Sequence, residues 1–395
     1  MTNIKNSSIK TIVWFMCIAY CAIEMLLWSE NVISFTLSIR IQSSLCLLSL
    51  LLCLPEKGFL KLIFKSPLVI WLIWIVYVGI QGWFLHMDFS AYYRALFTFF
   101  NMALVAFMAQ RDFRRTLKLL VIALFITTIA SLVILPLAIN VERDNGNINW
   151  SANSTVFLVS SILLLAIVEK WKIGKVLFWC LVPAATILIR ASRKSFVAVA
   201  IVFFAYAYTY FRTGKIQTKV YATILAAIFI GVFVFLLNNS IVGARLIGTG
   251  SSDAYFVSQY ASGTFWDKFD ERGLMYYYGI QIFKENPVFG IGLNNFKYAF
   301  VIELVAHSEY IVQFCECGSV GFLIFLFFYA RLFRLLKRRH KMKSESQHTD
   351  IYVFILGCLV MVFFLSLSTW LYNVTAWGCF IGLLIGYGSG YFIHN

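Results

Sequence analysis

Long apolar runs recur along the whole chain, and they constrain its fold more than any other feature. Of the 395 residues, 61% are hydrophobic and only 13% are charged. A run of about twenty apolar residues is long enough to cross a bilayer as a helix, in which every backbone group is hydrogen-bonded within the segment. The sequence therefore predicts an all-α, polytopic integral membrane protein in which residues 1–395 form a single transmembrane domain.

Hydropathy predicts about twelve transmembrane helices. The expected spans are 11–28, 32–54, 66–85, 95–110, 117–139, 151–169, 176–190, 195–211, 220–237, 309–330, 351–371 and 376–392. The first run is interrupted by Glu24 and lacks a small-residue cleavage site, so we expect a retained helix rather than a signal peptide.

One connection between the expected spans is much longer than the others. Residues 238–308 are expected to form a large external, periplasmic loop that contains short helices. Within it, the spacing of apolar residues from Leu274 to Phe283 predicts an amphipathic helix lying against the membrane, and Asn286-Pro287 should end that helix.

The formal charge of +15 could suggest a nucleic-acid partner, but the distribution of the basic residues argues for membrane orientation instead. With a cytoplasmic N-terminus, the inner loops collect Lys57, Lys61, Lys65, Arg111, Arg114, Arg115, Lys118, Lys170, Lys172, Lys175, Arg212, Lys215, Lys219 and the group from Arg331 to Lys343. Both termini are therefore expected in the cytoplasm, and no nucleic-acid partner is expected.

Seven of the nine cysteines fall inside apolar runs, where thiols usually behave as small hydrophobic groups. Cys315 and Cys317 form a C-x-C pair, but no second pair with metal-ligand spacing lies nearby. We expect neither a disulfide framework nor a metal site.

Several basic residues run against the expected topology because they lie on its outer side, among them Arg143, Arg190, Arg193, Lys194, Arg245 and Arg272. Arg190 and Arg193 are three residues apart and would share one helical face. Guanidinium groups offer bidentate hydrogen bonds to phosphate, so the cluster suits an anionic ligand at the outer membrane surface. Two alternatives stay open: Lys194 as an anchor of a helix end to lipid headgroups, and Arg272 in an ion pair with Asp270 or Glu271.

His307 is a candidate general base, because an imidazole accepts a proton near neutral pH and could deprotonate a sugar hydroxyl. A histidine at a membrane interface is more often a simple polar cap. Gly318 and Gly321 follow it, and their spacing permits close helix packing.

Four motifs together resemble the O-antigen ligase and polymerase superfamily, over roughly residues 140–325. His307-Ser308-x9-Gly318-x2-Gly321 is similar to that family's H-[N/S/Q]-x9-G-x2-G pattern. Ser192-Arg193-Lys194-Ser195 resembles its helix-end Ser-Arg motif. Arg272 and the segment Pro287–Phe296 resemble elements of its large external loop, and Asn147-Ile-Asn149 resembles an Asn-rich element of its polymerases.

The resemblance implies a metal-independent glycosyltransferase without a cofactor, acting at the outer face of the cell inner membrane on glycans carried by undecaprenyl diphosphate. It implies that Arg193 and Arg272, with help from Arg190, hold the diphosphate, and that His307 orients or deprotonates the acceptor hydroxyl. Further substrate contacts are expected from Lys194, Arg143, Arg245 and Asn149. The expected partners are the lipid-linked saccharides, the bilayer, a chain-length regulator and a flippase.

Three activities are compatible with these motifs. A polymerase would move the growing glycan onto the non-reducing end of the next lipid-linked repeat unit, and the element at Asn147 and Asn149 favours this reading. A ligase would use a lipid A core sugar as acceptor. An exporter of the same lipid-linked sugars would instead need basic residues lining a path through both leaflets.

Overall fold

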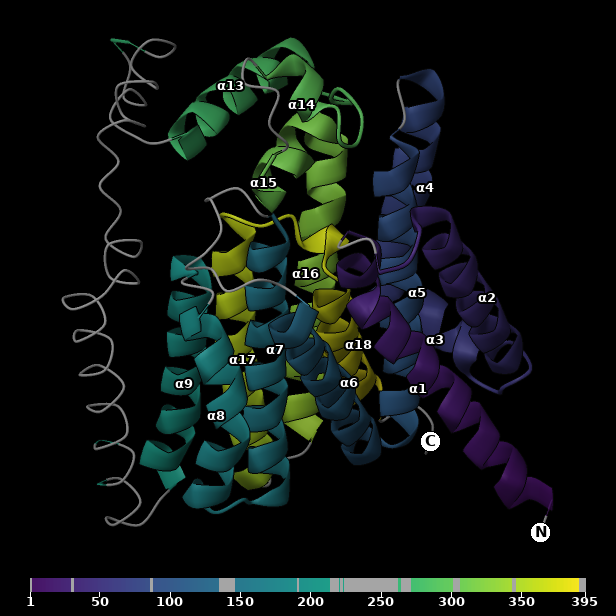
Figure 1. Cartoon of the computed structure of the whole chain (residues 1–395), viewed down its shortest axis with the longest axis vertical. Helices are drawn as coiled ribbons and strands as arrows, with labels where there is room; N and C mark the ends of the chain where they lie inside the picture. Colours follow the sequence, from purple (N-terminus) through teal and green to yellow (C-terminus); the bar gives the residue numbers. More distant parts are fainter. Residues whose placement is uncertain are drawn as a thin grey trace.

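The computed structural model describes residues 2–29, 32–85, 88–134, 146–189, 192–213, 271–300, 306–342 and 346–390, together with residues 220, 223, 262 and 263. This part of the chain consists of helices and their connections, without a strand (Figure 1). The longer helices are α1 (Thr2–Ser29), α2 (Phe35–Cys53), α4 (Leu68–Phe84), α5 (Phe89–Arg111), α6 (Phe113–Ile134), α7 (Gly146–Glu169), α8 (Ile173–Ile189), α9 (Arg193–Thr213), α13 (Glu271–Glu285), α16 (Gly318–Met342), α17 (Ser346–Ser366) and α18 (Thr375–Ser389). The shorter ones are α3 (Phe59–Lys65), α14 (Phe296–Ala299), α15 (Glu309–Ile311), the π-helix η2 (Val312–Glu316) and the 3₁₀-helix η3 (Leu371–Asn373).

Six of the described helices are long and apolar enough to cross a membrane, and α3 with α4, bent by 76° between them, would add a seventh. Helices α8 and α18 and residues 194–209 of α9 are apolar but shorter. These findings agree with a polytopic membrane protein. The count of about twelve spans stays a prediction, because the expected span 220–237 lies outside the described residues apart from positions 220 and 223.

The expected span 309–330 is wrong in its boundaries. Helix α15 and the π-helix η2 occupy residues 309–316, and α16 begins only at Gly318, whose φ of +65° is left-handed and interrupts the helical path. Three polar side chains in this stretch, Glu309, Gln313 and Glu316, are buried against other parts of the protein. The long transmembrane helix starts after them and continues to Met342.

Short helices do occur in the described part of the predicted external loop. Helix α13 covers the range expected from the apolar spacing and ends at Glu285, directly before Asn286-Pro287. Its buried side packs on α15 and η2, since a Cβ on Gly279 would lie 2.9 Å from Ile311 Cδ1 and 3.1 Å from Cys315 Sγ. The position of α13 relative to the membrane surface stays a prediction.

Ion pairs tie the predicted inner loops together at one end of the helix bundle, the lower end in Figure 1. Glu56 binds both Lys10 and Arg111, and Glu169 accepts from Arg114 at 2.7 Å and from Lys118 at 2.6 Å. Arg212 and Asp350 form a further pair at 2.8 Å, between α9 and α17. The opposite end carries α13, α14, α15 and the first residues of α9 (Figure 1). Which end faces the cytoplasm stays a prediction from the distribution of charge.

Helices α5 and α18 approach each other closely in the core. Gly378, Gly382 and Gly386 recur every fourth residue on α18 and face α5 directly. A Cβ on Gly386 would lie 2.5 Å from the carbonyl oxygen of Ala106, and one on Gly382 would overlap that of Met102. The small residues therefore let the two backbones approach closely, as in other membrane helix pairs.

We expect Gly382→Ala to destabilise the protein by about 1–3 kcal/mol, because the new methyl group forces α5 and α18 apart. Thermal unfolding of the detergent-solubilised protein measures this. Gly174→Ala in α8 is the control, since a Cβ at that position meets nothing within 4 Å. An unchanged melting temperature for Gly382→Ala would contradict the close approach of the two helices.

Candidate functional site

Residues 366–370, from the last residue of α17 to the residue before η3, are the place where the segments that carry the predicted motifs meet. Lys194, in the first turn of α9, donates from Nζ to the carbonyl oxygen of Ser368 at 2.8 Å and to Thr369 Oγ1 at 2.9 Å. The backbone N–H of Glu309 donates to the carbonyl oxygen of Thr369 at 3.1 Å. The helix-end Ser-Arg motif and the histidine motif therefore hold the same short loop.

Helix α13 reaches this loop through Tyr276. The Tyr276 hydroxyl donates to the carbonyl oxygen of Leu367 at 2.6 Å and lies 3.0 Å from Ser308 Oγ. Ser308 is fully buried and donates in turn to the carbonyl oxygen of Ser366 at 3.2 Å. Arg272 lies one helical turn before Tyr276, so α13 carries the arginine motif to the place where the histidine motif lies.

A buried chain of polar groups links α7 and α9 to the same loop. Ser192 Oγ lies 2.9 Å from Ser195 Oγ, and Ser195 donates to Asn153 Oδ1 at 3.2 Å. Asn153, in α7, donates from Nδ2 to Thr369 Oγ1 at 3.4 Å. The two serines of the Ser-Arg motif thus fix the start of α9, and α7 brings the Asn-rich element to the same end of the bundle.

His307 lies beside this loop with its imidazole exposed. Its backbone N–H points at Met275 Sδ, at 3.1 Å, and its ring stands edge-on to Trp370 at 6.4 Å between centroids. The flanking residues Ala306 and Ser308 are buried. The backbone of His307 is therefore anchored between buried neighbours, while the residue itself is exposed.

The structure describes the remaining predicted site residues only in part. Arg193 is the first residue of α9, Arg272 is the second of α13, and Asn149 lies in the first turn of α7, but for these three the backbone alone is described. Arg143, Arg190 and Arg245 lie outside the described residues. The segments that carry Arg193, Lys194, Arg272 and His307 thus come together, while the direction of each arginine side chain stays a prediction.

Sequence reasoning missed Glu309, a fully buried carboxyl group two residues after His307. Its Oε1 accepts from Gln313 Nε2 at 2.9 Å and its Oε2 from the backbone N–H of Tyr372 at 3.3 Å. Gln313 also accepts from Trp74 Nε1 at 2.9 Å. Burial raises the pKa of Glu309 to about 7. The sequence did contain a signal for Glu309, because an acidic residue at the start of a predicted transmembrane span indicates a functional or structural role.

The glycines of two motifs have a structural role, because they let two loops touch backbone to backbone. Gly290 and Gly318 both have left-handed φ angles, of +72° and +65°. A Cβ on Gly290 would lie 2.5 Å from the carbonyl oxygen of Glu316, and one on Gly318 would lie 2.6 Å from the backbone nitrogen of Gly290. No side chain fits at either position.

Backbone hydrogen bonds join the same two segments. Ile291 and Gly292 donate to the carbonyl oxygens of Cys315 and Glu316, both at 2.9 Å, and Ser319 donates to that of Pro287 at 2.9 Å. This pairing holds the end of α13 against the start of α16. The external-loop motif and the two glycines after His307 therefore form one unit that fixes α13 beside the histidine.

A second buried acid, Glu316, secures this unit. Its carboxylate oxygens accept from the backbone N–H groups of Asn294 at 2.7 Å and Phe296 at 3.2 Å. Burial raises the pKa of Glu316 to about 8. Cys315, one residue earlier, is buried and donates to the carbonyl oxygen of Gly279 at 2.9 Å, so this thiol of the C-x-C pair serves packing of α13.

We expect the protein to lose stability as the pH rises from about 4.5 to about 7, because the buried Glu309 keeps its proton in a range where the unfolded chain has released it. Glu309→Gln should reduce this loss by about 2–3 kcal/mol, while Glu316 continues to contribute. Thermal unfolding across this pH range measures the effect. Glu285→Gln, at an exposed position at the end of α13, is the control, and an equal pH slope in wild type and Glu309→Gln would contradict the assignment.

Comparison with known proteins bears on the same part of the chain. Residues 176–326 match the family model described as O-antigen ligase, and no curated protein matches the chain. The matched range runs from α8 into α16 and contains the Ser-Arg motif, Arg272, the Pro287–Phe296 segment and the histidine motif. Residues 176–326 are thus similar to the O-antigen ligase family, which agrees with the resemblance to the O-antigen ligase and polymerase superfamily drawn from the sequence motifs.

Proposed function

We propose that the protein is a polysaccharide polymerase. It transfers a growing glycan from undecaprenyl diphosphate to the non-reducing end of the next lipid-linked repeat unit, at the outer face of the inner membrane. The family match supports a transferase of the O-antigen ligase and polymerase type. The observation that supports the site most strongly is the meeting of α7, α9, α13 and the His307 segment at residues 366–370.

In this proposal Arg193 and Arg272 bind the diphosphate of the donor. Both residues lie in the first turn of a helix, and these two helices reach the same loop. Helix N-termini present backbone N–H groups and a positive partial charge, so they favour a phosphate for the same reason that guanidinium does. Arg190, Lys194, Arg143, Arg245 and Asn149 supply further substrate contacts.

The transfer forms one bond and breaks another. The acceptor hydroxyl oxygen attacks the anomeric carbon of the donor sugar, and the bond from that carbon to the diphosphate oxygen breaks. The acceptor proton passes to the imidazole of His307, and undecaprenyl diphosphate leaves with its negative charge offset by the arginines. These cations do electrostatically what a divalent ion does in other transferases, so the proposed reaction needs no metal or cofactor.

The alternative with the same chemistry is a ligase, whose acceptor is a lipid A core sugar. The Asn147 and Asn149 element favours the polymerase, because it resembles an element of the polymerases in this superfamily. A third possibility is an exporter of lipid-linked saccharides, which would work without breaking the bond to the diphosphate. A chain-length regulator and a flippase are the expected partners of the polymerase.

Deleting the gene separates the polymerase from the ligase. We expect the deletion strain to carry surface cores that bear one repeat unit, because repeats are still made and attached but are no longer joined. Electrophoresis of the surface glycan measures this. Bare cores together with lipid-linked polymer would indicate a ligase, and unpolymerised lipid-linked repeat units retained in the cytoplasmic leaflet would indicate an exporter.

We expect Arg193→Ala, Arg272→Ala and His307→Ala each to lower the transfer rate by at least about a hundredfold, through lost charge stabilisation or lost proton transfer. The rate is measured with lipid-linked repeat units and the purified, membrane-reconstituted protein. Lys284→Ala is the matched control, because Lys284 is an exposed basic residue at the other end of α13 from Arg272. Full-length polymer from all three variants would disprove the site.

A further inference from the structure

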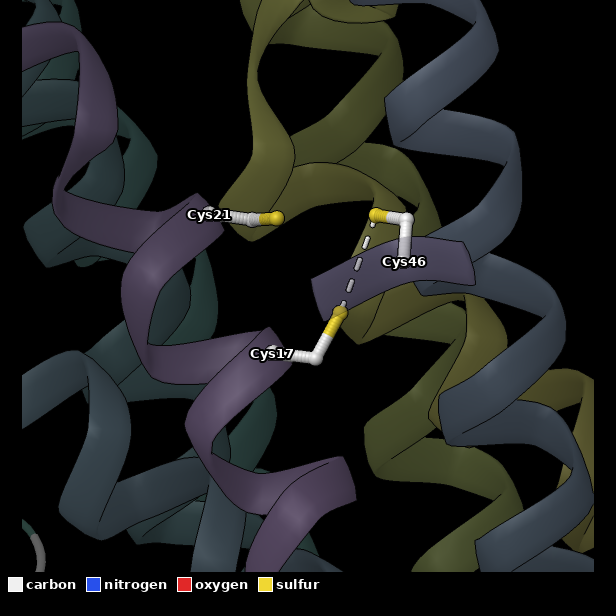
Figure 2. A group of neighbouring side chains, drawn as sticks. All are labelled: Cys17, Cys21 and Cys46. Atoms are coloured by element: carbon white, nitrogen blue, oxygen red, sulfur yellow. Dashed lines mark hydrogen bonds between the residues drawn. The ribbon is translucent and has the colours of Figure 1, made fainter. Parts of the chain in front are cut away.

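Three cysteines far from the proposed transfer site face one another between α1 and α2 (Figure 2). Cys17 and Cys21 are one helical turn apart on α1, and Cys46 lies opposite them on α2. Their sulfur atoms all lie within 4.8 Å of one another, and those of Cys17 and Cys46 are 3.7 Å apart. All three side chains are buried. Treating each thiol as a separate small hydrophobic group does not account for this convergence.

The spacing of the sulfur atoms is that of ligands sharing one metal ion. With a metal–sulfur distance of about 2.3 Å, two sulfurs of a tetrahedral site lie about 3.8 Å apart and those of a trigonal site about 4.0 Å apart. The Cys17–Cys46 separation of 3.7 Å is about 0.3 Å shorter than the trigonal value, and the other two sulfur pairs lie within 4.8 Å.

The polar groups around the cluster also fit a ligand. Ser49 borders Cys17 and Asn101 borders Cys21. Among the described residues, Ser49 Oγ and Asn101 Oδ1 are buried oxygens without a hydrogen-bond partner, in side chains 3% and 0% exposed. Gln42, also buried, points its Nε2 at Cys21 Sγ from 3.5 Å. The Ser49 hydroxyl and Gln42 Nε2 can both donate to metal-bound sulfur, as the second shell of a thiolate site does.

We propose that Cys17, Cys21 and Cys46 bind a soft d¹⁰ metal ion, Cu(I), which fastens α1 to α2. Thiolate sulfur selects Cu(I) and Zn(II) over hard cations. Three sulfurs complete a trigonal Cu(I) site, whereas Zn(II) requires a fourth ligand. The three thiols bind as thiolates and release their protons to solvent as the ion enters. The ion has a structural role, and the proposal is independent of the transfer reaction.

The test uses the full-length, reduced protein in detergent without oxygen. Cu(I) is titrated against a chromophoric Cu(I) chelator, and Zn(II) is titrated in a parallel arm. We expect wild type to bind a single equivalent of Cu(I) and to melt at a higher temperature with it. Cys17→Ser, Cys21→Ser and Cys46→Ser should each weaken binding by at least about tenfold. Cys180→Ser and Cys358→Ser, at buried cysteines of α8 and α17, are the controls and should bind as wild type does.

Three results would overturn the proposal. The first is the absence of stoichiometric Cu(I) binding by folded wild type, and the second is undiminished binding by Cys46→Ser. Tighter binding of Zn(II) than of Cu(I) would overturn the identity of the ion. Size-exclusion chromatography of each variant identifies any that fails to fold, and Cys46→Ala then replaces Cys46→Ser.

Discussion

The candidate site depends on hydrogen bonds to one short connection, residues 366–370, between α17 and η3. Lys194, Tyr276, Ser308 and the backbone of Glu309 all donate to this connection. These donors come from α9, from α13 and from the segment that carries His307. Helix α13 also contacts the His307 segment directly, because the His307 N–H points at Met275 Sδ and the Tyr276 hydroxyl lies beside Ser308 Oγ. A segment that carries no motif of its own therefore acts as the common anchor, and the relative positions of α9, α13 and His307 follow from it.

The second constraint is steric. Gly290 and Gly318 allow the external-loop motif to pair with the turn before α16, and a side chain at either position would meet backbone atoms. This pairing places the end of α13, and hence Arg272 at its beginning, on the same rigid unit as His307. Residues that contact no substrate can therefore be as necessary for transfer as those that do, because they determine where the catalytic groups lie.

Much of the fold could be predicted from local sequence. Apolar runs located a helix in nearly every expected span, and the Asn286-Pro287 stop was correct, because length and helix breakers are local properties. The start of α16 was missed, because the break at Gly318 is accompanied by close contact with the backbone of Val288 and Gly290, which are distant in the sequence. Glu309 and residues 366–370 were missed for a related reason: their partners are distant in sequence. Cys17 and Cys46 likewise come together only through the packing of α1 on α2.

The π-helix η2 adds one residue to the turn between His307 and α16, as the bond from the Cys317 N–H to the Val312 carbonyl oxygen shows. One residue corresponds to about 100° of rotation around a helix axis. The extra residue therefore determines how the preceding residues are rotated about the helix axis relative to α16. Without it, His307 and Glu309 would be rotated by more than a quarter turn relative to α16. The π-helix η2 thus helps to determine the direction of His307, and a regular α-helix over the same residues would place it differently.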